Sequence, residues 1–352
     1  MSRILSYTVA LREAMQEALR RDPSVFVYGL GVPDPKAIFG STLGLQEEFG
    51  SDRVFDMPTA ENGMTGVGVG AALTGSRPVL ISQRLDFYLL AMDQLVNNAA
   101  KWHYMFGGAA RVPLTVRLIL GRGWGQGPTH SQSLQSWFAH IPGLKVVMPA
   151  LPDDAYGLML ASIFDDNPVV FLDHRWLHNT QMEVPDELSS IPLGRARVLR
   201  EGTDCTVVSM SLMSVEAIRA AEFLSKHGVN AEVIDLRSVA PIDWETIFAS
   251  VVKTGRLVVC DTSHLTCSVS AEIVARVVES CFQNLLAPPK RVALPDVPTP
   301  TSSALTQDYY PGAEEIVAAV AEVTATSIDL SSLMRQRSGP HDVPGDWFTG
   351  PF

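Results

Sequence analysis

A single acidic residue, Glu61, precedes a stretch of the sequence that carries almost no charge. Residues 57–78 read MPTAENGMTGVGVGAALTGSRP, and their repeated glycines allow another backbone to come close. We predict a helix with Thr59 as its N-cap, which places Glu61 in the first turn, where the helix dipole favours a carboxylate. The plain interpretation is an acid that caps a buried helix. The alternative is a functional acid, and the rest of the chain has to decide between them.

Two further candidates follow the ends of predicted strands, where open α/β sheets bind their ligands. His130 ends the glycine-rich loop GRGWGQGPTH (121–130), a suitable place for a mobile catalytic imidazole. It can also simply cap a helix that starts near Ser131. Phe87 begins a predicted helix, where an aromatic side chain normally belongs to the core.

Familiar ligand-binding motifs are missing from the sequence. The GVGVG run at 66–70 lies inside a predicted helix and has the wrong spacing for a dinucleotide fingerprint, and the 121–130 loop lacks the Lys-Ser/Thr ending of a P-loop. There is no GxSxG elbow, HExxH pair or EF-hand loop. If the chain acts on a phosphorylated cofactor, we expect another polypeptide to hold the phosphates.

The overall composition is that of a well-buried globular protein. Of the 352 residues, 46% are hydrophobic and 18% charged, which argues against disorder. The net charge of −11 disfavours nucleic acid or an anionic membrane as the main partner. The sequence contains neither an apolar run of membrane-spanning length nor a secretory signal. The four cysteines lack zinc or disulfide spacing, so we expect buried thiols in a reducing cytoplasm.

Short apolar segments alternate with helical segments in two successive blocks. This pattern predicts two doubly wound α/β domains, each with a buried, mainly parallel sheet. We expect a first domain over 1–185, a linker over 186–202, a second domain over 203–325 and an irregular arm over 326–352. The first domain is expected to open with a helix over 4–21 and to contain a second long helix over 87–106.

Several of these segments together resemble one family. TAENGMTGVGVGAALTGSRPV, DFYLLAMDQLVNNAAK, THSQSLQSWFAHIPGLKVVMPA and DDNPVVFLDHRWL are similar to the beta subunit of thiamine-diphosphate-dependent 2-oxoacid dehydrogenases, the decarboxylase component of the pyruvate and branched-chain complexes. VIDLRSVAPIDWETIFASVVKTGRLVV extends the resemblance into the second half. It implies an N-terminal pyrimidine-binding, transketolase-like domain and a C-terminal transketolase-type domain.

The resemblance also implies roles for the candidate residues. Glu61 would hydrogen-bond the ring nitrogen of the cofactor's aminopyrimidine and so favour activation of the thiazolium carbon, which requires a desolvated acid of raised pKa. Phe87 would stack on the aminopyrimidine, and Thr59 would belong to the same cofactor site. His130 would serve 2-oxoacid binding and acyl transfer. An alpha subunit would hold the diphosphate through Mg²⁺.

Further expectations concern ions and partners. A loop matching a monovalent-cation (K⁺) site of some members is formed by Leu114, Ser162, Asp165 and Asn167, although DDNP is by default only a turn. The resemblance implies a heterotetramer of two alpha and two beta chains, with a beta–beta dimer inside it and a lipoyl acyltransferase as a possible further partner.

The sequence departs from the family at three places. Residues 260–273, CDTSHLTCSVSAEI, replace a stretch that often begins Glu-Gly-Gly, which leaves assembly into a larger complex open. Trp124 brings a bulky side chain to the mouth of the expected site, and Leu85 replaces an aromatic of the pyruvate enzymes. The identity of the 2-oxoacid therefore stays open.

We expect oxidative decarboxylation of a 2-oxoacid with acyl transfer to a lipoyl carrier. One alternative is a split transketolase-like carboligase that passes its carbanion to an aldehyde. The other is a non-catalytic scaffold for an alpha chain, which the joint presence of Glu61, Phe87 and His130 disfavours.

Overall fold

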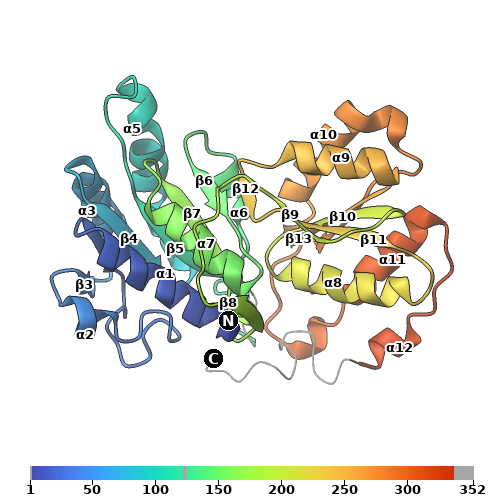
Figure 1. Cartoon of the computed structure of the whole chain (residues 1–352), viewed down its shortest axis with the longest axis horizontal. Coiled ribbons are helices and arrows are strands. Elements are labelled where there is room, and N and C mark those ends of the chain that lie inside the picture. Colours follow the sequence, from blue (N-terminus) through green and yellow to red (C-terminus); the bar gives the residue numbers. More distant parts are fainter. Residues whose placement is uncertain (1, 122–124, 337–352) are drawn as a thin grey trace. The chain divides into compact units, whose positions relative to one another are not determined.

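The computed structural model describes residues 2–121 and 125–336, so Trp124 lies outside the described residues. The chain divides into two compact units, each with its own mainly parallel sheet (Figure 1). Of the described residues, the first unit contains 2–120 and 137–193, and the second contains 121, 125–136 and 194–336. The prediction of doubly wound α/β domains is confirmed.

The sheet of the first unit is built around a fully buried strand, β5 (Thr115–Leu120). Its sequence, TVRLIL, is the continuous apolar run that a parallel sheet covered on both faces requires. The parallel order is β6 (Lys145–Val147), β7 (Val169–His174), β5, β4 (Arg77–Ser82), β2 (Val25–Tyr28) and β3 (Val54–Phe55).

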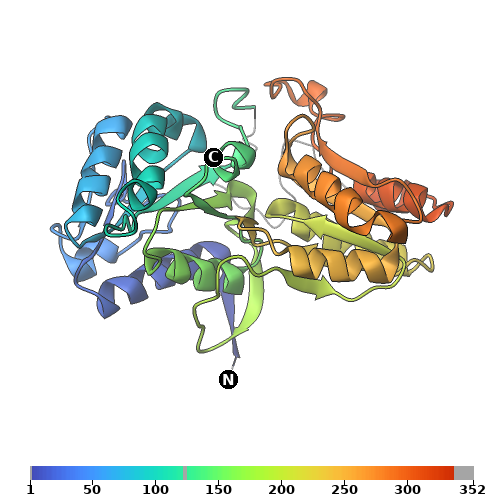
Figure 2. The ribbon, with the colours of Figure 1, turned by 90° about the horizontal axis from the view of Figure 1, so that it is seen from above.

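Helices cover both faces of this first sheet, as Figures 1 and 2 show. On one face α1 (Tyr7–Arg21) packs against α7 (Pro152–Ile163). On the other face α3 (Glu61–Leu73) packs on β4 and on the π-helical turn Gln94–Ala99. Shorter helices complete the unit: α2 (Leu45–Phe49), α4 (Leu85–Tyr88), α5 (Ala100–Met105) and α6 (Gln135–Ala139), the last of which begins in the second unit.

Two predicted helices of the first unit are wrong in part. The segment expected as a helix over 4–21 begins as strand β1 (Ser2–Ser6), which pairs antiparallel with β8 (Gln181–Pro185). Helix α1 starts only at Tyr7 because the Ser6 side chain caps it by accepting a hydrogen bond from the Val9 backbone N–H.

The helix expected over 87–106 is divided into successive short turns. Helix α4 is followed by a 3₁₀ turn (Leu89–Ala91), by the π turn and by α5. The periodicity of the sequence correctly predicted a helical segment, but it could not distinguish α, 3₁₀ and π turns. All three bond their N–H groups to carbonyl groups within the segment.

The second unit has a sheet with one antiparallel edge. Its order is β14 (Lys290–Leu294), β13 (Leu257–His264), β10 (Cys205–Ser209), β11 (Ala231–Asp235) and β9 (Arg197–Arg200), with only β9 antiparallel. Helices α8 (Leu212–Ser225) and α11 (Ala313–Thr324) cover one face, and α9 (Trp244–Thr254) and α10 (Val269–Cys281) cover the other (Figure 1). The short strand β12 (Ser238–Ala240) follows β11.

Some features of the second unit lie in segments that we expected to be irregular. Strand β9 falls within 186–202, the segment expected as a linker. The expected C-terminal arm begins with a short helix, α12 (Ser331–Met334), whose Leu333 is buried in the core. Residues 337–352 lie outside the described residues.

Two findings bear on the composition-based expectations. No helix among residues 2–121 and 125–336 is long and apolar enough to cross a membrane. All four cysteines are free, and three of them are buried as expected, but Cys267 is exposed because it lies in the turn between β13 and α10.

A buried ionic network joins the two central strands of the first sheet. The guanidinium of Arg117, on β5, donates two hydrogen bonds to the carboxylate of Asp173, on β7, at 2.8 and 3.0 Å. It donates a third to Ser41 Oγ, and Nε2 of His178 lies 2.6 Å from the same carboxylate. Nδ1 of His178 has no hydrogen-bond partner among the described residues. Burial lowers the pKa of His178 to about 4, so its ring is neutral and donates from Nε2.

Acidification should therefore destabilise the wild type more than a His178→Gln variant. Between pH 6.5 and about 4 the unfolded chain protonates His178 while the folded chain keeps it neutral, so the free energy of unfolding falls as the pH falls. We expect the wild type to lose about 2 kcal/mol more than the variant between pH 7.5 and 4.5, measured by urea denaturation. Parallel pH profiles for the two proteins would contradict a buried neutral histidine.

Candidate active site

Helix α3 begins at Glu61 itself. Its N-cap is Ala60, which offers no side-chain cap, and the prediction that Thr59 caps the helix is wrong. Thr59 is exposed ahead of the helix. The carboxylate of Glu61 belongs to a half-buried residue and makes no hydrogen bond or ion pair with the described residues. The carboxylate of Glu61 can therefore accept hydrogen bonds from a group outside the described part of the chain.

The inner side of α3 lies very close to the sheet. The hydroxyl of Tyr28, on β2, donates a hydrogen bond to the Met64 carbonyl oxygen at 3.0 Å. A Cβ atom at Gly68 would lie 2.2 Å from that hydroxyl oxygen and 3.3 Å from Leu114. Only glycine permits this approach, so Gly68 sets the distance between the helix that carries Glu61 and the sheet.

The outer side of α3 is open. A Cβ atom at Gly63 or Gly70 would meet nothing within 4 Å, and Val67 between them is 57% exposed. Positions 63, 67 and 70 share one helix face. Leu90, on the adjoining 3₁₀ turn, is 69% exposed. Apolar side chains thus form an uncovered face beside Glu61, a feature that marks interaction surfaces. We call this set (Gly63, Val67, Gly70 and Leu90) the open face.

Phe87 is not a core residue. It lies on α4, directly after β4, and is 38% exposed, whereas Leu85 two residues earlier is completely buried. The core interpretation of Phe87 is therefore excluded. The side chain of Leu85 fills the interior of the first unit. The exposed ring of Phe87 provides the aromatic surface at this end of β4.

His130 lies in a turn of the second unit. Its Nδ1 is 3.0 Å from Thr129 Oγ1, and its backbone N–H points to the Gly127 carbonyl oxygen at 3.4 Å. No helix starts at Ser131; the next helix, α6, begins at Gln135. The interpretation of His130 as a helix cap is therefore excluded, and its imidazole is half-buried.

Two cationic side chains from neighbouring strands already contact the loop expected to bind a monovalent cation. Lys145 lies 2.5 Å from the Asp165 carboxylate, and Arg77 donates to the Asp165 carbonyl oxygen at 2.9 Å. The Leu114 carbonyl accepts from the Val169 N–H, and the Ser162 carbonyl accepts from the Asp165 N–H. The buried Oδ1 of Asn167, in contrast, has no hydrogen-bond partner among the described residues. That oxygen suits a cation ligand.

Within residues 2–121 and 125–336 no group of three or more His, Cys, Asp or Glu side chains is arranged to hold a metal ion.

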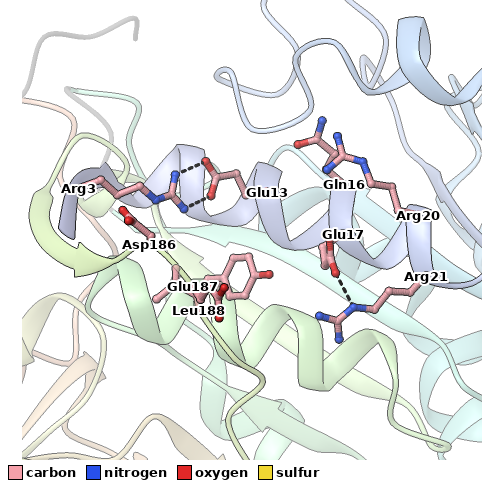
Figure 3. A pocket seen from close by; sticks show the side chains of 10 residues that line it. Arg3, Glu13, Gln16, Glu17, Arg20, Arg21, Asp186, Glu187 and Leu188 are labelled. Carbon is pink, nitrogen blue, oxygen red and sulfur yellow. Dashed lines mark hydrogen bonds and ion pairs between the residues drawn. The ribbon is translucent and has the colours of Figure 1, made fainter. Parts of the chain in front are cut away.

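An open hollow elsewhere in the first unit is not the site. Its volume is about 510 Å³, and it lies between α1, α7 and the chain after β8 (Figure 3). The arginines in its lining are paired with acids: Arg3 with Glu13, Arg21 with Glu17, and Arg20 with Glu48 outside the lining. None of the candidate residues lines it.

Sequence reasoning missed a buried polar contact in the second unit. Gln135 is completely buried, and its side-chain amide donates to the carboxylate of Asp261, also completely buried, at 2.6 Å. The one available signal was an aspartate inside the apolar strand LVVCDTSH. Its partner lies 126 positions away, beyond the reach of any local pattern.

Comparison with known proteins first defines the class. The family model "Transketolase, pyrimidine binding domain" matches residues 4–180, and "Transketolase, C-terminal domain" matches residues 194–316. A solved chain described as "Split gene transketolase, inactive beta4 tetramer" superposes with a TM-score of 0.72 at 22% identity, over 92% of this chain and 99% of its own. That likeness supports the fold alone.

Curated relatives narrow the class further. The beta subunit of acetoin:2,6-dichlorophenolindophenol oxidoreductase from Bacillus subtilis is 41% identical, over 92% of this chain and 98% of its own. The pyruvate dehydrogenase E1 beta subunit of Rhizobium meliloti is 43% identical over 89% and 68%, and that of Rickettsia felis is 40% identical over 91% and 98%. The chain belongs to the transketolase-like family of E1-type beta subunits. The resemblance inferred from the sequence is confirmed.

The glycines of α3 allow a matched stability test. Gly68→Ala should lower the free energy of unfolding by about 2–3 kcal/mol, because the new methyl group would overlap the Tyr28 hydroxyl and break its hydrogen bond. Gly63→Ala on the same helix should be neutral or stabilise the isolated chain by up to about 1 kcal/mol, since alanine is the better helix former and the space is open. Urea denaturation measures both. Equal effects would show that α3 does not lie against the sheet as described.

Proposed function

We propose that this chain is the beta subunit of a thiamine-diphosphate-dependent 2-oxoacid dehydrogenase, which acts together with an alpha subunit. Membership of the family of E1-type beta subunits supports this proposal most directly. The sequence has no phosphate-binding motif, which agrees with an alpha chain that holds the diphosphate and Mg²⁺. When bound, thiamine diphosphate supplies the carbanion chemistry that amino-acid side chains lack.

Glu61 is proposed to hold and orient the cofactor's aminopyrimidine through a hydrogen bond to its ring nitrogen. Its carboxylate has no partner among the described residues and stands at the start of a helix without other charges. Phe87 presents an exposed flat ring that can stack on an aromatic ligand. Thr59 is proposed to belong to the same cofactor site. His130 is proposed to bind the oxoacid and to assist acyl transfer.

The open face of α3 is proposed to bind the alpha subunit. The single chain leaves Glu61 only half-buried, whereas proton sharing with a ring nitrogen favours a desolvated acid. Glycines with open space at the Cβ position and the exposed Val67 and Leu90 suit a second helix packed at short distance. An alpha chain at this face would complete the desolvation of Glu61. We propose two alpha and two beta chains with a beta–beta contact, and a lipoyl acyltransferase as a further partner, in the cytoplasm.

The relatives favour a dehydrogenase over the carboligase alternative, because they carry dehydrogenase or oxidoreductase names. Among them are enzymes named for pyruvate and for acetoin, so both compounds belong in the first substrate screen.

Replacing Glu61 by glutamine should remove catalysis without unfolding the protein. The chain would be co-purified with its alpha-like partner and tested with pyruvate, branched 2-oxoacids and acetoin, with dichlorophenolindophenol as electron acceptor. We expect Glu61→Gln to lower kcat by at least about 100-fold, because the amide can neither share nor accept the proton.

Glu47→Gln provides the matched control, since Glu47 is an exposed acid in the first turn of another helix, α2. It should keep wild-type activity, and both variants should keep the wild-type Tm within a few degrees. Full activity of Glu61→Gln would contradict the assignment. Ketol formation with an aldehyde, without electron transfer to the dye, would favour the carboligase.

We also propose that the loop of Leu114, Ser162, Asp165 and Asn167 accepts a monovalent cation, supported by the unpartnered Oδ1 of Asn167. K⁺ should raise the Tm of the wild type by a few degrees relative to choline at equal ionic strength, because binding to the folded state alone stabilises it. Asn167→Ala should abolish this response. Identical melting curves of the wild type in KCl and choline chloride would exclude the site.

A further inference from the structure

The contact between Gln135 and Asp261 fastens the segment that carries His130. Gln135 is the first residue of α6, and its amide donates to Asp261 Oδ1 at 2.6 Å and to Thr262 Oγ1 at 3.0 Å. Both acceptors belong to β13, in the same unit. His130 precedes Gln135 by only five residues, so the position of the amide limits where the imidazole can lie.

Asp261 is a well-supported anchor. Its Oδ1 also accepts from the backbone N–H and the hydroxyl of Ser263, both at 3.0 Å, and its Oδ2 accepts from the Ser270 N–H at 3.0 Å. Burial raises the pKa of this carboxyl, as expected for an acid removed from water. A buried carboxylate is retained at a cost in desolvation, and the donors around it hold it in one geometry.

The N-terminal end of the segment that carries His130 is held by close packing at Gly125 and Gly127. A Cβ atom at Gly127 would lie 2.6 Å from Thr301 Oγ1, and one at Gly125 would lie 3.1 Å from the Thr301 carbonyl oxygen. Both glycines have positive φ, 72° and 75°, so no other residue suits these positions without strain. Residues 128–134 between the two anchors contain no helix or strand. The place of His130 thus depends on tertiary contacts at both ends.

We propose that Gln135 and Asp261 are a positioning pair for His130. This inference rests on the proposed function, in which His130 acts on the substrate. Neither residue of the pair has to touch the substrate; the pair reduces the number of conformations open to residues 128–134 and so keeps the imidazole near its working position. Loss of the pair should therefore lower activity only as long as His130 is present to be positioned.

A double-mutant cycle on the reconstituted complex tests this dependence. Gln135→Leu keeps a similar volume but cannot donate, and we expect it to lower kcat by about 10- to 100-fold. In a His130→Ala background the same substitution should change kcat by less than about 3-fold, because the positioned group is gone. Hydrogen–deuterium exchange of residues 125–136, which needs neither cofactor nor substrate, should be faster in Gln135→Leu than in the wild type.

Ser214→Ala is the control for general loss of a buried polar contact. It removes the 3.0 Å hydrogen bond from Ser214 to Asp235, in the same unit but on helix α8, and should leave kcat within about twofold of wild type. If Gln135→Leu fails to fold, Thr262→Val removes only the second acceptor of the amide and enters the same cycle.

Two outcomes would overturn the inference in distinguishable ways. Equal losses from Gln135→Leu with and without His130 would show that the pair supports the unit as a whole and does not position the imidazole. A His130→Ala variant with wild-type activity would instead refute the role of His130 in the proposed function, and the inference would fall with it.

Discussion

The buried ion pair between Arg117 and Asp173 is the interaction on which the first unit depends. It links β5 to β7 in the centre of the sheet, and its remaining hydrogen bonds bring in Ser41 and His178. Both charges are removed from water, so loss of either partner would leave an uncompensated buried charge, at a typical cost of about 3–5 kcal/mol. The segments that carry Phe87 and Asn167 are attached to β4 and β7 of this sheet. The pair acts directly on β7, which follows Asn167, whereas β4, which precedes Phe87, is joined to β5 by strand pairing.

The glycines of helix α3 allow close packing but lower the stability of the helix, and these two effects conflict in an isolated chain. Gly68 lets the helix lie against Tyr28, which gains packing, but each glycine in a helix interior costs up to about 1 kcal/mol of helix stability. Gly63 and Gly70 bring the same cost, although the space that a Cβ would occupy there is open and no close approach within the described chain requires glycine. Contacts with a partner at the open face would offset this loss of helix stability and would remove Glu61 from water. The same surface thus connects assembly with the chemistry proposed for the acid.

Much of the fold could be predicted because buried parallel strands require continuous Val, Ile and Leu runs, which the sequence shows in TVRLIL and CTVVS. Local patterns failed where the deciding partner is far away. Strand β1 exists because β8, more than 170 residues later, pairs with it, so the first residues looked like a continuation of α1. The cap expected at Thr59 failed because the backbone enters α3 through Ala60 without using the threonine side chain.

The sequence by itself determined the α/β class, the family and the position of Glu61 at the start of a glycine-rich helix, since periodicity and motif order are local properties of the chain. Only the tertiary structure decided that Gly68 faces the sheet while Gly63 and Gly70 face outward, that Phe87 is exposed, and that Gln135 meets Asp261. These facts depend on contacts between residues far apart in the chain. Each contact is made by close packing or by hydrogen bonds between buried groups, and no local pattern of residues encodes which distant side chain will supply the partner.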